Sequence, residues 1–184
     1  MDILGTLLDI VKYTVPALIV LIASYSIVKK FLITETQRKH MAIFRESQDI
    51  TLRLRLQAYE RMVLFIERII PGQLIPRIYD PSMTVRDLQQ AYIFNVRAEF
   101  EHNLAQQIYV SKNVWETVKS VKEQEINMVI QVAQTLNPEA PAKDLHTRIL
   151  EILLRTDQEL PTAVALQIIN EEVKIVMSFG SIQG

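Results

Sequence analysis

Residues 13–28 read YTVPALIVLIASYSIV, an apolar run without a single charged side chain. As a helix rising 1.5 Å per residue, this run is about 24 Å long, which is shorter than the roughly 30 Å hydrocarbon core of a bilayer. The apolar residues 31–33 extend the run, and the two lysines between can reach the headgroups through their long side chains. We therefore expect residues 13–33 to form one transmembrane helix.

The side chains at both ends of this segment are basic or aromatic, as is usual where a helix leaves the hydrocarbon. Those expected at the membrane interfaces are Lys12, Tyr13, Tyr25, Lys29 and Lys30. A cleaved signal peptide fits less well, because Asp2 stands where a basic region is expected and the run is followed by two lysines. A buried core helix of a soluble protein is the other alternative, and it would rarely run so long without charge.

Basic residues are concentrated after the apolar run. Only Lys12 precedes it, whereas residues 29–55 contain seven lysines and arginines. An excess of Lys and Arg marks the cytoplasmic side, so we expect an inner-membrane protein of a bacterium with its N-terminus outside and its C-terminal domain in the cytoplasm. The absence of cysteine fits this reducing compartment. The same basic residues either contact anionic lipid headgroups or act as a topology signal only.

Composition limits both the fold and the chemistry. Of 184 residues, 49% are hydrophobic and 22% are charged, and the formal net charge is −1. The length suits one domain with an appendage. With four glycines and no cysteine, the chain is unsuited to Gly-rich phosphate loops and excludes disulfides, thiolate metal sites and cysteine nucleophiles. The near-zero net charge gives no indication of nucleic acid, and we expect no cofactor and no metal.

Downstream of the apolar run, helical periodicity is interrupted by proline at three places, residues 71–81, 137–141 and 160–161. The chain is therefore predicted to be all-α, with an N-terminal transmembrane helix followed by a cytoplasmic antiparallel helical bundle with coiled-coil-like packing. The predicted divisions are an anchor over residues 1–33, a basic juxtamembrane helix or linker over 34–50, and a cytoplasmic α-helical domain over 51–184.

The first helix of that domain is predicted to end at Pro71 and to start afresh near Asp49 or Thr51, with the anchor helix ending near Ser47. Its apolar residues are spaced 4-3-4-3-4, as in a heptad seam. The seam consists of Leu52, Leu56, Tyr59, Val63, Ile66 and Ile70. Arg53, Glu60 and Glu67 are expected on the opposite face.

The remaining helices have recognisable starts. Thr84 and Asp87 resemble a capping box for a helix running to about Tyr109, and Ser111 is a candidate cap for a helix that ends at Asn137-Pro138. Two further helices are predicted over residues 142–155 and 161–177. In the last helix, one face is predicted to hold Ala163, Leu166, Ile169, Val173 and Val176, and the other Glu171, Glu172 and Lys174.

A polar stripe is the only candidate site within these helices. Its members share one helical face and are Asn95, Glu99, His102, Asn103 and Gln106. Glu99 and His102 form one Glu-x-x-His pair, which is half of the ligand set of a ferritin-like di-iron centre. Since the other half is missing, a solvated face or a buried hydrogen-bond network is favoured over a metal site. We expect another helix to cover the stripe in part.

Several strings of residues resemble a known family. They are LRLQAYER over residues 54–61, LFIER over 64–68, EFEHNL over 99–104 and QQIY over 106–109, all following the dibasic end of the apolar run. With these strings the chain resembles a family of single-pass membrane proteins of unknown function from Bacteroidota, up to about residue 136. The resemblance implies the same membrane topology and brings no activity or catalytic residue.

These observations favour a non-enzymatic scaffold or accessory subunit of an inner-membrane protein complex, which acts through helix–helix contacts. Its partners would be the lipid bilayer and other membrane or cytoplasmic proteins, with a homo-oligomer left open and nucleic acid not expected. Two alternatives are a helical metal-binding protein or enzyme centred on Glu99 and His102, and a soluble helical adaptor whose first helix belongs to the core.

Overall fold

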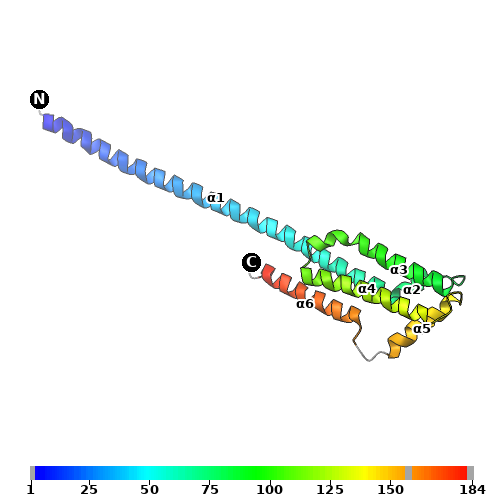
Figure 1. The fold of residues 1–184 in the computed structure, drawn as a ribbon. Coiled ribbons are helices and arrows are strands. Elements are labelled where there is room, and N and C mark those ends of the chain that lie inside the picture. The colour runs from blue at the N-terminus through cyan, green and yellow to red at the C-terminus, as the bar shows by residue number, and fades with distance from the viewer. Residues whose placement is uncertain (1–2, 156–158, 182–184) are drawn as a thin grey trace. The chain divides into compact units, whose positions relative to one another are not determined.

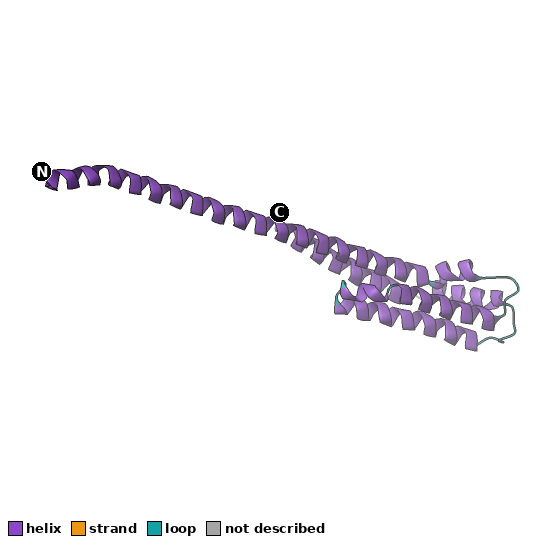
Figure 2. Cartoon of the chain, turned by 90° about the horizontal axis from the view of Figure 1, so that it is seen from above, coloured by secondary structure: helices purple, strands orange, loops and turns teal. Residues whose placement is uncertain are grey.

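The computed structural model describes residues 3–155 and 159–181, with side chains for residues 12, 14–16, 18–155 and 159–178 (Figure 1). These residues form six α-helices and one short 3-10 helix. Over the same ranges the structure contains no strand, and its one isolated β-bridge joins Thr84 and Pro141 (Figure 2). The predicted all-α fold is confirmed.

Internal contacts divide the chain into two compact units, residues 1–50 and residues 51–184, which are described separately. The helix α1, Ile3–Ile69, contains the helical part of the first unit and the first helix of the second. The predicted restart near Asp49 or Thr51 is therefore wrong. No proline or glycine interrupts this stretch, and the Ser47 hydroxyl, at the predicted end of the anchor helix, donates a hydrogen bond to the carbonyl of Ile43 one turn back (2.9 Å), as serines inside a helix commonly do.

In the first unit, the apolar side chains of α1 are exposed. The large hydrophobic side chains described between Val15 and Ile33 have exposed fractions of 47–68%. From Thr14 onwards the helix is long and apolar enough to cross a membrane, with a window of mean hydropathy 1.8 of which 0% is buried. Pro16 lies inside the helix, near its start.

The second unit begins with the end of α1, which stops at Ile69 because Pro71 follows. The other helices are α2 (Pro71–Ile78), α3 (Val85–His102), the 3-10 helix η1 (Leu104–Ile108), α4 (Lys112–Gln134), α5 (Ala142–Arg155) and α6 (Pro161–Ser181). α3 packs against α2, α4 and α5, and α4 packs in addition against α5 and α6. The largest fully buried side chains of the core are Tyr59, Met62, Phe65, Ile66, Ile69, Ile75, Leu88, Tyr92, Leu145, Ile149 and Ile169.

Local capping residues in the sequence set the starts of α3 and α4. Thr84 and Asp87 form a reciprocal capping box, in which the backbone N–H of Asp87 donates to Thr84 Oγ1 (3.2 Å) and that of Thr84 donates to Asp87 Oδ2 (3.0 Å). Ser111 caps α4 by accepting from the N–H of Val114 (3.1 Å). Both predicted caps are confirmed.

Four features of the predicted helices need correction. α3 ends at His102 and not near Tyr109, since η1 follows, in which Leu104 and Ile108 are exposed (42% and 73%) and provide no burial to hold an α-helix. The prolines of residues 71–81 predict a break between helices, whereas the structure places a short helix, α2, within this stretch. α4 ends at Gln134, three residues before Asn137, and α6 continues past residue 177.

The helical phase predicted for α1 is rotated from the observed one. Met62, Phe65 and Ile69 are fully buried although the heptad seam omits them, whereas Val63 and Ile70 are only half-buried. The predicted outer residues Arg53, Glu60 and Glu67 are exposed as expected. The buried face is wider than a two-helix seam because α1 has more than one helix to pack against in this unit.

Candidate functional site

The predicted membrane-interface residues lie on the exposed first unit. Lys12, Tyr25, Lys29 and Lys30 have exposed side chains, and the Lys29 ammonium lies 5.9 Å from the centre of the Tyr25 ring. Tyr13 belongs to α1, but its side chain falls outside the described residues. The distance between Lys29 and Tyr25, which are one helical turn apart, is that of a weak cation–π contact.

The structure does not keep the predicted polar stripe as one continuous face, because α3 gives way to η1 after His102. His102 is exposed, whereas Asn103 is buried and donates a hydrogen bond to the carbonyl of Glu99 (2.8 Å). Asn95 donates within its own helix, to the carbonyl of Ala91 (2.8 Å), and is half-buried like Gln106. The side-chain amides of Asn95 and Asn103 thus both donate to backbone carbonyls of α3 itself.

Glu99 is the one member of the stripe that joins two helices. Its carboxylate accepts a hydrogen bond from the guanidinium of Arg68 at the end of α1 (2.9 Å), and Arg77 in α2 donates to the backbone carbonyl of Arg68 (2.7 Å). Glu99 is thus already engaged by a cation. Among the described residues there is no group of three or more His, Cys, Asp or Glu side chains placed to hold a metal ion.

A polar cluster of the second unit is centred on Glu172 of α6. Tyr59 of α1 donates its hydroxyl proton to Glu172 Oε1 (2.7 Å), and Ser111 donates to Glu172 Oε2 (2.6 Å). Ser111 is also the cap of α4. A single carboxylate therefore joins three helices through short, charge-assisted hydrogen bonds.

The environment keeps Tyr59 in its neutral, donating form. Burial raises the pKa of its hydroxyl, the hydrogen bond to Glu172 raises it further, and the nearby Arg55 guanidinium acts in the opposite direction. Arg55 itself donates to the carbonyl of Tyr109 (3.3 Å). Because both carboxylate oxygens of Glu172 are occupied, the geometry suits the positioning of helices.

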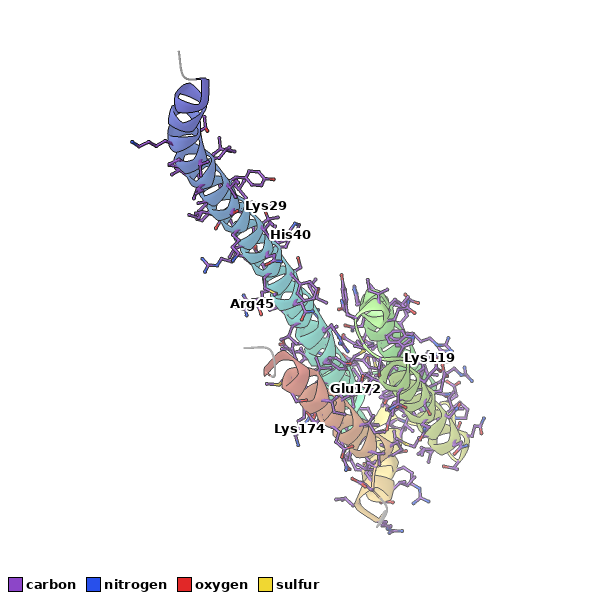
Figure 3. The ribbon with its side chains drawn as sticks, turned by 90° about the vertical axis from the view of Figure 1, so that its left-hand side faces the viewer. Lys29, His40, Arg45, Lys119, Glu172 and Lys174 are labelled. Carbon is purple, nitrogen blue, oxygen red and sulfur yellow. The ribbon has the colours of Figure 1, made fainter. Side chains whose placement is uncertain are left out.

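The position of Glu172 corrects a prediction from the sequence. It was expected on the outer face of α6 beside Glu171 and Lys174, yet it faces α1 while Lys174 points away (Figure 3). Ala163 is exposed and Thr162 and Ala165 are buried instead, so the inner face of α6 is rotated toward residues 162, 165, 169, 172 and 176. The repeated spacing of three and four residues from Ala165 through Ile169 and Glu172 to Val176 was the signal that could have found it.

A second buried carboxylate, Glu125 of α4, was not singled out from the sequence. Its side chain is buried, and no group of the described residues donates a hydrogen bond to its Oε2. Burial raises the pKa of Glu125 to about 7. The hydroxyl of Tyr92, whose pKa is raised by burial and by Glu125, donates instead to the carbonyl of Ile69 (2.6 Å). Glu125 is therefore a proton-binding group within the core.

Comparison with known proteins gives a family and no activity. No curated protein and no solved structure matches the chain significantly. One family model matches residues 5–176, which is nearly the whole length and includes every residue of the Glu172 cluster. The chain belongs to this family, the family of unknown function DUF7935.

Proposed function

We propose that this chain is a non-enzymatic, single-pass membrane protein of a Bacteroidota bacterium. It serves as a scaffold or accessory subunit of an inner-membrane complex. Residues 13–33 span the membrane with the N-terminus outside, and residues 51–184 form an antiparallel cytoplasmic bundle with coiled-coil-like packing. The bundle recruits other proteins through helix–helix contacts.

The observation that carries the proposal is the exposure of the apolar part of α1. Its large hydrophobic side chains from Val15 to Ile33 are about half to two-thirds exposed. In water such a continuous apolar surface is strongly unfavourable, at roughly 25 cal/mol per Å². Lipid tails remove this cost without any protein partner, and the backbone of a helix already satisfies its own hydrogen bonds.

The scaffold role is supported by the side chains of the second unit. Its most connected polar groups, Glu172 and Glu99, are paired with residues of other helices. At the same time, large apolar side chains remain on its surface, with exposed fractions of 72% for Phe94, 73% for Ile108 and 86% for Leu154. Such groups are suited to contact partner helices.

Carbonate extraction of bacterial membranes, followed by purification from detergent and mass spectrometry of the proteins that co-purify, tests both parts. The intact protein should remain in the membrane pellet. Replacing Leu21 and Ile22 together by arginine should release it, because each arginine at a span centre costs about 3 kcal/mol. The matched control, Leu21→Ile with Ile22→Leu, should stay in the pellet.

Two outcomes would contradict the proposal. Release of the unaltered protein by carbonate would remove the anchor and favour the soluble adaptor. If the protein stays in the membrane pellet but no other protein co-purifies with it at a reproducible stoichiometry after mild solubilisation, the membrane anchor is supported and the scaffold role is refuted.

A further inference from the structure

We propose that residues 33–50 of α1 pair with the same residues of a second copy, as a parallel two-stranded coiled coil. The proposal rests on the proposed function, because the membrane anchor gives both copies the same orientation. It concerns the part of the first unit that follows the apolar run, for which the sequence predicts a basic juxtamembrane helix or linker and which forms part of α1.

Three isoleucines and three polar residues of this segment lie at the core positions of one heptad register. Six residues are spaced alternately three and four apart, which places them on one face of a helix. They are Ile33, Thr36, His40, Ile43, Ser47 and Ile50. Their three isoleucines have exposed fractions of 48%, 62% and 55%, so α1 leaves this face available.

Charged side chains avoid this stripe and concentrate on the other faces. Arg38 and Arg45 occupy the heptad position farthest from it, and Figure 3 shows Arg45 on the side of α1 opposite His40. Glu35 and Lys39 pair with each other along the same helix (3.8 Å). Two copies can therefore bring their stripes together without placing arginine, lysine or carboxylate side chains face to face.

The polar residues of the stripe are compatible with burial between two helices. The hydroxyls of Thr36 and Ser47 donate to the backbone carbonyls of Leu32 (2.8 Å) and Ile43 (2.9 Å), so neither donor is lost when water is excluded. His40 occupies a core position of the repeat. A polar residue there lowers stability but favours one register and one number of strands.

The second copy is favoured over another occupant by the geometry of the anchor. Between residues 33 and 50 the side chains of α1 are mostly exposed, so this part of the helix gains little stability from packing within the first unit and pairing would add to it. Two copies inserted in one bilayer start from the same depth and run in the same direction. This arrangement places Ile43 opposite Ile43 and Ile50 opposite Ile50, which is the contact that a parallel heptad requires.

Cysteine cross-linking in membranes tests this arrangement directly, because the natural chain contains no cysteine. Single variants of the full-length protein carry Ile43→Cys or Ile50→Cys in the stripe, with Arg38→Cys and Arg45→Cys as matched controls on the outer face. Membranes holding two differently tagged copies are oxidised with copper phenanthroline. The stripe variants should yield at least ten-fold more disulfide-linked product than the controls, and the product should carry both tags.

Equal cross-linking at all four positions, or none at Ile43 and Ile50, overturns the pairing. A linked product that carries only one tag and has the mass of a different protein overturns the second copy as occupant. Carbonate extraction of the same membranes separates this failure from failure of the anchor. A protein that stays in the pellet without cross-linking refutes the coiled coil alone, whereas one that is extracted refutes the proposed function.

Discussion

At the scale of single residues, we expect the buried carboxyl group of Glu125 to make the stability of the protein depend on pH. Its folded pKa of about 7 lies above the ordinary value of 4.5, so the folded state binds more protons between these values. The free energy of unfolding should therefore fall as pH rises through this range. Above pH 7 the loss should reach about 3 kcal/mol, since each pKa unit corresponds to about 1.4 kcal/mol.

Glu125→Gln should remove this loss and raise the melting temperature at pH 8 more than at pH 5, measured on the detergent-solubilised protein. Glu123→Gln is the matched control, because Glu123 lies on the same helix with an exposed side chain paired to Lys122. If both substitutions changed the melting temperature equally at both pH values, burial would not be raising the pKa of Glu125.

Glu172 is the residue whose removal should loosen α6 most. Glu172→Ala deletes the acceptor of two hydrogen bonds and leaves the hydroxyls of Tyr59 and Ser111 without it. We expect a loss of about 2 kcal/mol in the free energy of unfolding, given that hydrogen bonds to charged groups contribute about 1.5–3 kcal/mol each and this site is half-buried.

Urea unfolding of Glu172→Ala, Tyr59→Phe and the double variant measures the coupling between them. A coupling of roughly 1 kcal/mol is expected for groups in direct contact. Glu171→Ala, next to it on the exposed face, should change stability by under about 0.5 kcal/mol. Additive losses in the cycle would show that the hydrogen bond contributes nothing to the attachment of α6.

At the scale of elements, the sequence identifies helices better than it identifies their faces. Caps and prolines act locally, and the starts of α3, α4 and α6 follow from Thr84, Ser111 and Pro161 alone. The faces of α1 and α6 depend on how many neighbours each helix has, which no local spacing reveals. A heptad template assumes one partner, so in α1 it omitted Met62 and Phe65. In α6 the apolar face predicted from Ala163 and Leu166 left Glu172 on the outer side, whereas its carboxylate accepts a hydrogen bond from Tyr59 of α1.

The candidate site shows the same limit. The polar stripe joined residues from Asn95 to Gln106 on the assumption of an unbroken helix, and the transition to η1 separates them. The Glu172 cluster joins residues up to 113 positions apart. Only the tertiary arrangement brings its members together, because a lone glutamate on an amphipathic helix is usually solvated.

The observed phase of α1 predicts which substitutions damage the second unit. Met62→Asp should lower the free energy of unfolding by several kcal/mol, since it places an unpaired carboxylate in the core. Val63→Asp should cost clearly less because Val63 is half-buried, and the exposed control Glu60→Lys should cost under about 0.5 kcal/mol. Thermal melts that ranked Val63→Asp above Met62→Asp would restore the heptad seam predicted from sequence.

At the scale of the whole molecule, the distribution of basic residues predicts the orientation in the membrane. The segment after the apolar run carries seven lysines and arginines within residues 29–55, against Lys12 before it. The cytoplasmic surface of the membrane retains such residues during insertion. A reporter that is active only in the cytoplasm, fused after Gly184, should therefore be active.

Moving the excess of basic residues to the other side of the apolar run provides the control for this topology. Replacing Lys29, Lys30, Arg38 and Lys39 by glutamine while adding lysines ahead of residue 12 should lower the cytoplasmic reporter signal and raise that of a periplasmic reporter at the same site. Substituting arginine for the lysines among those four residues preserves the charge and should leave both signals unchanged. A periplasmic C-terminus in the unaltered protein would reverse the orientation and place the second unit, with its exposed Phe94 and Ile108, among extracytoplasmic partners. The coiled coil would survive that reversal, because it depends only on two copies entering the bilayer in the same direction.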